Sequence, residues 1–209
     1  APAIALERQY LVTEDVPGIE ALAAELPVLR DIEAPLYIRQ ERHGLVLGLF
    51  DDKPVFWAED GMPADFEQEL LPPDMERLTA SFDAALRRIP ILADLGIKRT
   101  INGPLNRSAD GNPLIGPVQG LPNFWMHSGF FAGIALAGSC GALLARWMTE
   151  GEPDRDVGAL DARRFGDWTG HGYAAATATA AYVHEFSPIH PHEEPPRETP
   201  TRTSALYDR

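Results

Sequence analysis

The chain has 209 residues, of which 44% are hydrophobic, and this is enough to bury one good core or two small ones. Its 31 acidic residues outnumber 18 basic ones, and the formal net charge of −13 repels nucleic-acid phosphates and anionic membrane surfaces. We therefore expect neither nucleic acid nor a membrane as a partner. Cys140 is the single cysteine, which excludes an intrachain disulfide and favours a reducing, cytoplasmic location.

The start of the chain and its most apolar stretch bear on whether the sequence is complete and whether it crosses a membrane. Ala1 stands where a complete chain would have methionine, so we expect this sequence to be part of a longer polypeptide. Residues 111–145 contain no Asp, Glu, Lys or Arg. Three prolines interrupt the first part of this stretch, and residues 129–145 are few for a bilayer core of about 30 Å. The stretch predicts a buried strand, loop and helix.

The first part of the chain predicts an antiparallel sheet. The expected strands are 8–13, 36–39, 45–50 and 54–57. Short polar turns join the last three, and connections this short favour antiparallel pairing. After Pro17 and Gly18, apolar residues recur at helical spacing from Ile19 to Leu26, which predicts a short helix.

The rest of the chain predicts helices separated by short strands. Met75, Leu78, Phe82 and Leu86 have the spacing of an amphipathic helix. Further helices are expected from Gly133 to about Gly151 and over 174–183, with strands at 97–101 and 114–116 and a buried one at 123–127. Residues 187–209 are rich in Pro, Glu, Thr and His and predict an extended linker. The fold class is therefore α+β.

A glycine-rich turn follows the expected strand at 123–127. Residues 127–141 read His-Ser-Gly-Phe-Phe-Ala-Gly-Ile-Ala-Leu-Ala-Gly-Ser-Cys-Gly, which places small residues at the start of a helix. Free N–H groups and the positive end of the helix dipole stabilise a ligand that becomes anionic there, such as the edge of a reduced flavin. The alternative is that Gly129, Gly133 and Gly138 only allow close helix packing.

An ordered series of sequence blocks resembles the dimethylglycine and sarcosine dehydrogenase family. The match covers nearly the whole chain, and its specificity lies in the order of the blocks. The blocks are Gln9–Glu14, Leu26–Asp31, Tyr37–Glu41, Glu69–Asp74, Asn102–Pro104, Asp110–Pro117, Gly120–Trp125, Gly129–Phe130, Gly151–Pro153 and Leu160–Gly166.

The resemblance implies a flavoenzyme that oxidises an N-methylated amino acid such as dimethylglycine or sarcosine by hydride transfer to FAD. The resulting iminium is hydrolysed to formaldehyde, or its one-carbon unit passes to tetrahydrofolate in a longer parent protein. The resemblance also implies three parts. Residues 1–96 form an antiparallel substrate-domain sheet with flanking helices, 97–150 the returning strand and helix of an FAD-binding domain, and 151–209 an extended linker toward an absent folate-binding domain.

The resemblance places one set of residues on the flavin side. They are Gly103, Pro104, Asp110, Gly111, Gly116, Gly129, Phe130, Gly133 and Ile134. The G-x-G-x-x-G turn that holds the FAD pyrophosphate in the family is absent from this sequence. We therefore expect an N-terminal FAD-binding half, in the same parent chain or another subunit, to supply the rest of the site.

A substrate contact is expected on the sheet. Tyr37 and Arg39 could face the amine substrate, with the guanidinium of Arg39 pairing its carboxylate. The alternative is an exposed arginine beside a half-buried tyrosine. No catalytic residue is assigned from the sequence.

The remaining candidate groups give no further site. His184, His190 and His192 lie among Pro and Glu without the spacing of a metal site, so no metal is expected. Cys140 is expected to be a packing residue. The alternative function is a non-catalytic binding or assembly subunit that retains the fold without the cofactor.

Overall fold

The computed structural model describes residues 3–51, 53–166, 168–185 and 191–192. Its strands are β1 (Ala3–Thr13), β2 (Leu29–Asp31), β3 (Leu36–Glu41), β4 (Gly44–Leu49), β5 (Phe56–Trp57), β6 (Ile97–Ser108), β7 (Leu114–Pro117) and β8 (Trp125–Ser128). Its α-helices are α1 (Met75–Arg88), α2 (Gly133–Glu150) and α3 (His171–Val183), and the short 3-10 helices are η1 (Ile19–Ala21), η2 (Pro90–Asp94) and η3 (Ala162–Arg164).

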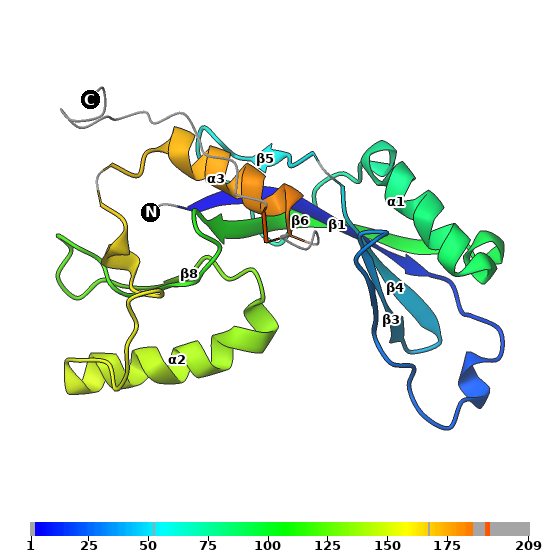
Figure 1. Ribbon diagram of the computed structural model, residues 1–209, viewed down its shortest axis with the longest axis horizontal. Coiled ribbons are helices and arrows are strands. Elements are labelled where there is room, and N and C mark those ends of the chain that lie inside the picture. Colours follow the sequence, from blue (N-terminus) through cyan, green and yellow to red (C-terminus); the bar gives the residue numbers. More distant parts are fainter. Residues whose placement is uncertain (1–2, 52, 167, 186–190, 193–209) are drawn as a thin grey trace.

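Strand β1 lies at the centre of a six-stranded antiparallel sheet (Figure 1). Along one edge it pairs with β6 over nearly its whole length, from Ala3 opposite Ser108 to Thr13 opposite Ile97. Along its other edge it pairs first with β5 and then with β4, which continues through β3 to β2. The antiparallel sheet expected from the short turns is confirmed, with β6 built into it.

The main core lies between this sheet and α1. Leu11, Leu47 and Leu78 are almost fully buried in a cluster that joins β1, β4 and the helix. The helix expected from the spacing of apolar residues is present as α1, because one of its faces is apolar. Asp74 caps the start of this helix: its carboxylate accepts a hydrogen bond from the backbone N–H of Arg77.

The second half of the fold joins a two-stranded sheet to α2. Strands β7 and β8 pair antiparallel, and α2 packs on them through Trp147. Gly116 of β7 makes this approach possible, because an added Cβ would lie 2.6 Å from the Trp147 ring. Figure 1 shows α2 on the side of the molecule opposite α1.

Helix α3 lies on the end of the main sheet. Ala178 and Tyr182 are buried against Ile4 and Leu6 of β1. Side chains alternate between the faces of a strand, so α3 covers the face opposite the one that α1 covers. Part of the segment expected as linker is therefore folded onto the sheet, while the expected tail 187–209 lies outside the described residues except at 191–192.

Two local expectations are wrong. Between residues 19 and 26 there is one 3-10 turn, Ile19–Ala21, instead of a helix, because Ile19 is buried while Leu22 and Leu26 are left exposed. The strand expected at 123–127 is present as β8 but is not buried: it pairs only with β7, and Phe124 beside it is 53% exposed. The division at residue 96 stays a prediction.

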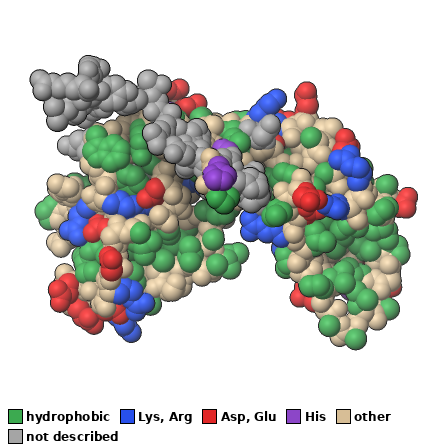
Figure 2. Space-filling model, in the orientation of Figure 1, with side chains coloured by type: hydrophobic (Ala, Val, Ile, Leu, Met, Phe, Trp, Pro, Cys, Tyr) green, Lys and Arg blue, Asp and Glu red, His purple; other side chains and the backbone are tan. Residues whose placement is uncertain are grey.

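Apolar side chains gather on the exposed start of α2. Phe131, Ile134 and Leu136 are all exposed, and Ile134 is as open as in an extended chain. Figure 2 shows two lobes with a hollow between them, and in Figure 1 the strands β3 and β4 lie on one side of it and α2 on the other.

Candidate functional site

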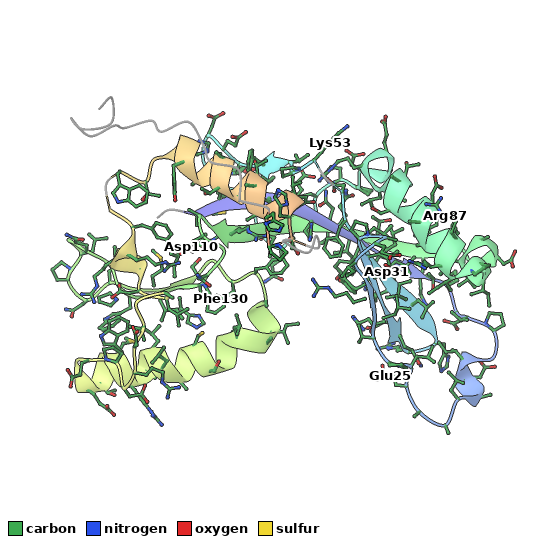
Figure 3. The ribbon with its side chains drawn as sticks, in the orientation of Figure 1. Glu25, Asp31, Lys53, Arg87, Asp110 and Phe130 are labelled. Atoms are coloured by element: carbon green, nitrogen blue, oxygen red, sulfur yellow. The ribbon has the colours of Figure 1, made fainter. Side chains whose placement is uncertain are left out.

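The glycine turn and the start of α2 form one part of the candidate site. Gly129 has φ of +72° and packs against Ser108 and Leu114, so its backbone requires glycine both for conformation and for space. Phe130, labelled in Figure 3, follows in the turn. The centroid of its ring is 4.5 Å from that of His127. No side chain among the described residues caps α2, so the N–H groups of its first turn are free of such a partner and suited to a ligand.

Three other expected flavin-side residues lie elsewhere on the fold. Gly103 and Pro104 are on β6, opposite Arg8 and Glu7 of β1. An added Cβ at Gly103 would meet nothing within 4 Å, so the sheet surface is open there. At Gly116, the ring of Trp147 fills the space that a Cβ would occupy, so no ligand can approach from that side. A flavin contact by these residues stays a prediction.

Asp110 organises the turn between β6 and β7. Its carboxylate receives a bidentate ion pair from Arg164, at 2.7 Å to each oxygen, and a hydrogen bond from the N–H of Asn112. Gly111 completes the turn with φ of +78°. Partial burial raises the pKa of Asp110, but the hydrogen bonds and charge of Arg164 outweigh it, and the pKa lies below its ordinary value of 3.8.

The lowered pKa of Asp110 predicts a loss of stability in acid. The folded protein binds this proton less readily than the unfolded chain, so the contribution of the ion pair to stability is fully present above the unfolded pKa and is lost as the pH falls through the lower, folded pKa. We expect the free energy of unfolding in urea to decrease below about pH 4, and this decrease to be smaller in Asp110→Asn. If the free energy of unfolding of Asp110→Asn falls with pH as steeply as that of the unaltered protein, protonation of Asp110 does not contribute to the loss.

The second part of the candidate site is the face of the main sheet away from α1. Tyr37 of β3 lies opposite Gly48 of β4, and an added Cβ at Gly48 would overlap the Tyr37 ring. The ring of Tyr37 is 5.9 Å from that of Phe50, and burial raises the pKa of its hydroxyl. Arg39, on the same face, is exposed and pairs with Glu41. Their contact with a substrate stays a prediction.

A buried ionic cluster, not found from the sequence, connects this face to the end of α3. Glu185 binds Arg8 of β1 at 2.9 Å and Arg107 of β6 at 3.2 Å. The Arg8 guanidinium also lies over the rings of Phe50 and Tyr182, at 4.0 and 4.7 Å. Burial raises the pKa of Glu185 in spite of its two cationic partners. We call Arg8, Arg107 and Glu185 the arginine clasp.

The arginine clasp joins the two parts of the candidate site. Arg107 lies 5.1 Å from the ring of Phe131, in the turn that leads into α2. A continuous series of contacts therefore runs from Phe131 through the arginine clasp to Phe50 and Tyr37 on the sheet. The glycine turn, β1, β6 and the segment after residue 150 are held in one arrangement.

A second buried group lies next to the arginine clasp. Arg77 of α1 binds Asp51 at 3.1 Å and Glu7 at 3.5 Å, and the Tyr182 hydroxyl is 3.1 Å from Asp51. The side chains of Arg77 and Asp51 are 11% and 8% exposed. This group connects α1, the end of β4 and α3 through charge instead of apolar packing.

The other candidate groups give no site within the described chain. Cys140 is buried in α2, as expected for a packing residue. The described part holds no group of three His, Cys, Asp or Glu side chains that could bind a metal, and His190 lies outside it. Among the helices described, none is long and apolar enough to cross a membrane.

Comparison with known protein families identifies the fold. A sequence model described as FAD dependent oxidoreductase matches residues 1–147, and one described as FAD dependent oxidoreductase central domain matches residues 150–204. The chain belongs to the FAD-dependent oxidoreductase family. The resemblance seen in the ordered blocks is confirmed, while the division of the chain into three parts stays a prediction.

Individual members of the FAD-dependent oxidoreductase family are similar to this chain over nearly its full length. Mitochondrial dimethylglycine dehydrogenase of Mus musculus is 39% identical over 99% of the chain, which covers 24% of that protein. Mitochondrial sarcosine dehydrogenase of Homo sapiens is 33% identical over 99% of the chain and 22% of that protein. The chain thus spans about a quarter of the length of these curated relatives.

A solved structure supports the fold alone. L-proline dehydrogenase from P. horikoshii has a TM-score of 0.62 and 23% identity, covering 78% of this chain and 40% of that one. The chemistry of the described residues also fits the FAD that the family implies. The open strand surface at Gly103 admits a flat ligand, and the uncapped start of α2 offers N–H donors to an anionic edge.

Proposed function

We propose that this chain is part of an FAD-dependent enzyme that oxidises N-methylated amino acids, with dimethylglycine, sarcosine or a related secondary or tertiary amine as substrate. The observation that carries the proposal is the 39% identity to dimethylglycine dehydrogenase over 99% of the chain. The open glycine surface and the cationic groups beside it support the same conclusion.

The chain's own residues would bind and orient the reactants. Gly103 and the first turn of α2 would contact the flavin, while the sheet face carrying Tyr37 would cover the substrate. Bound FAD supplies the hydride acceptor for this chemistry. The N-methyl carbon of the substrate would lose a hydride to this acceptor, and water would add to the resulting iminium carbon to release formaldehyde and the demethylated amine. Transfer of the one-carbon unit to tetrahydrofolate stays a prediction for a longer parent protein.

The experiment is a visible spectrum of this chain with FAD, with and without a polypeptide equivalent to the upstream part of its relatives. We expect flavin to be retained only with both polypeptides and to be bleached when sarcosine or dimethylglycine is added. Retention without bleaching by any N-methylated amino acid would contradict the substrate class. No retention in either mixture would favour a non-catalytic binding or assembly subunit.

Gly103→Val tests whether the open strand surface contacts the flavin. Nothing lies within 4 Å of an added Cβ and valine suits a strand, so we expect unchanged stability in urea. If a flat ligand lies there, the FAD dissociation constant measured by flavin fluorescence with both polypeptides should rise at least about tenfold. Gly172→Ala, which also meets nothing within 4 Å, is the control. Equal affinities for both variants would remove Gly103 from the flavin site.

A further inference from the structure

The guanidinium of Arg8 has hydrogen-bonding capacity that the described protein does not use. Nη2 donates to Glu185, whereas Nη1 is buried without a partner among the described residues. The contacts with Phe50 and Tyr182 fix the plane of the group. A fixed guanidinium with an unused donor is suited to bind a carboxylate in one orientation.

The buried charges around Arg8 balance as a whole. Within the arginine clasp, one carboxylate pairs with two guanidinium groups. In the group next to it, Arg77 pairs with two carboxylates, those of Asp51 and Glu7, so the three arginines and three acids carry no net charge. The case for a ligand carboxylate at Arg8 therefore rests on the unused donor and on the open surface beside it.

The sheet beside Arg8 leaves room for a small ligand. Gly103, directly opposite on β6, has no side chain, and nothing lies within 4 Å of the position that its Cβ would take. Tyr10 lies two residues further along β1 on the same face. Arg8 therefore lies next to the open surface where the flavin and substrate are proposed to meet.

We propose that Arg8 binds the carboxylate of the amino-acid substrate and so determines specificity, an inference that rests on the proposed function. Arg39, expected from the sequence to do this, is 44% exposed in its side chain and engaged by Glu41. Glu185 is a positioning residue: it holds Arg8 from the segment after residue 150. That segment thus contributes to substrate recognition without touching the substrate.

The test uses the complete FAD-loaded protein that contains this chain, with dimethylglycine and its methyl ester as substrates. Arg8→Gln should raise KM for dimethylglycine about thirtyfold, leave kcat less affected, and abolish the preference for the free acid over the ester. Arg8→Lys, which keeps the charge but loses the fork of donors, should give a smaller rise. Glu185→Gln should change the preference in the same direction, because Arg8 is then less well held.

A second readout does not depend on turnover. Acetate binding, measured by isothermal titration calorimetry, should weaken in Arg8→Gln and stay unchanged in Arg146→Gln, which removes an equal charge from an exposed ion pair on α2. Thermal melts show whether each variant folds. If Arg8→Gln does not fold, acetate binding is compared between Arg8→Lys and the unaltered protein instead.

The outcomes separate the two proposals. Absence of any turnover by the unaltered protein would overturn the proposed function, and the acetate titration would still test anion binding at Arg8. Turnover with an unchanged acid-to-ester preference in Arg8→Gln would overturn the assignment of Arg8 alone. A rise in KM confined to Arg39→Gln would return the carboxylate contact to β3.

Discussion

Asp51→Ala is expected to lower the free energy of unfolding by about 3 kcal/mol, because it leaves Arg77 buried beside one distant carboxylate. Arg77 is 11% exposed, and without Asp51 its remaining acidic partner is Glu7 at 3.5 Å. The Tyr182 hydroxyl would lose its partner in the same step, which loosens α3 from the end of β4. Urea unfolding of the protein measures the loss.

A double variant shows whether charge causes this loss. Asp51→Ala combined with Arg77→Met removes both charges and fills much of the space, so the pair should be less destabilising than Asp51→Ala alone. The matched control is Asp154→Ala, whose partners Arg146 and Arg155 are 59% and 67% exposed, and it should destabilise the protein far less than Asp51→Ala because water screens the exposed pair. Equal losses for Asp51→Ala and Asp154→Ala would contradict a buried ionic contribution.

Local sequence pattern was sufficient for most elements of the fold. The spacing of Leu78, Phe82 and Leu86 predicted α1 because the helix face that carries them enters the core. The short turns predicted the antiparallel pairing of β3 with β4. The same rule failed from Ile19 to Leu26, because apolar spacing produces a helix only where a second surface exists to receive it.

The long-range contacts of the candidate site carry no local signal. Arg8 lies among β-forming residues, and its partner Glu185 is 177 positions away, so neither periodicity nor a motif connects them. The glycine turn was found because Gly129 requires a left-handed conformation that sequence can suggest. Which arginine lies on the central strand β1 and which on β3 depends on the order of the strands, and no local pattern in the sequence gives that order.

Gly116→Ala is expected to destabilise the protein by about 3 kcal/mol through two separate effects. The backbone of Gly116 has φ of +111°, which side chains other than hydrogen rarely allow, and the new methyl group would lie 2.6 Å from the Trp147 ring. Gly120→Ala isolates the first effect, because Gly120 has φ of +80° and nothing within 4 Å of its Cβ position. That variant should cost about 1 kcal/mol.

The contribution of Trp147 is measured in a double-mutant cycle. In a Trp147→Phe background the ring atoms that meet the Gly116 methyl are removed, so the cost of Gly116→Ala should fall to that of backbone strain, about 1 to 2 kcal/mol. An unchanged cost would mean that β7 and α2 move apart without penalty. A reduced cost means that Gly116 sets the distance between them, and with it the position of the glycine turn that joins β8 to α2.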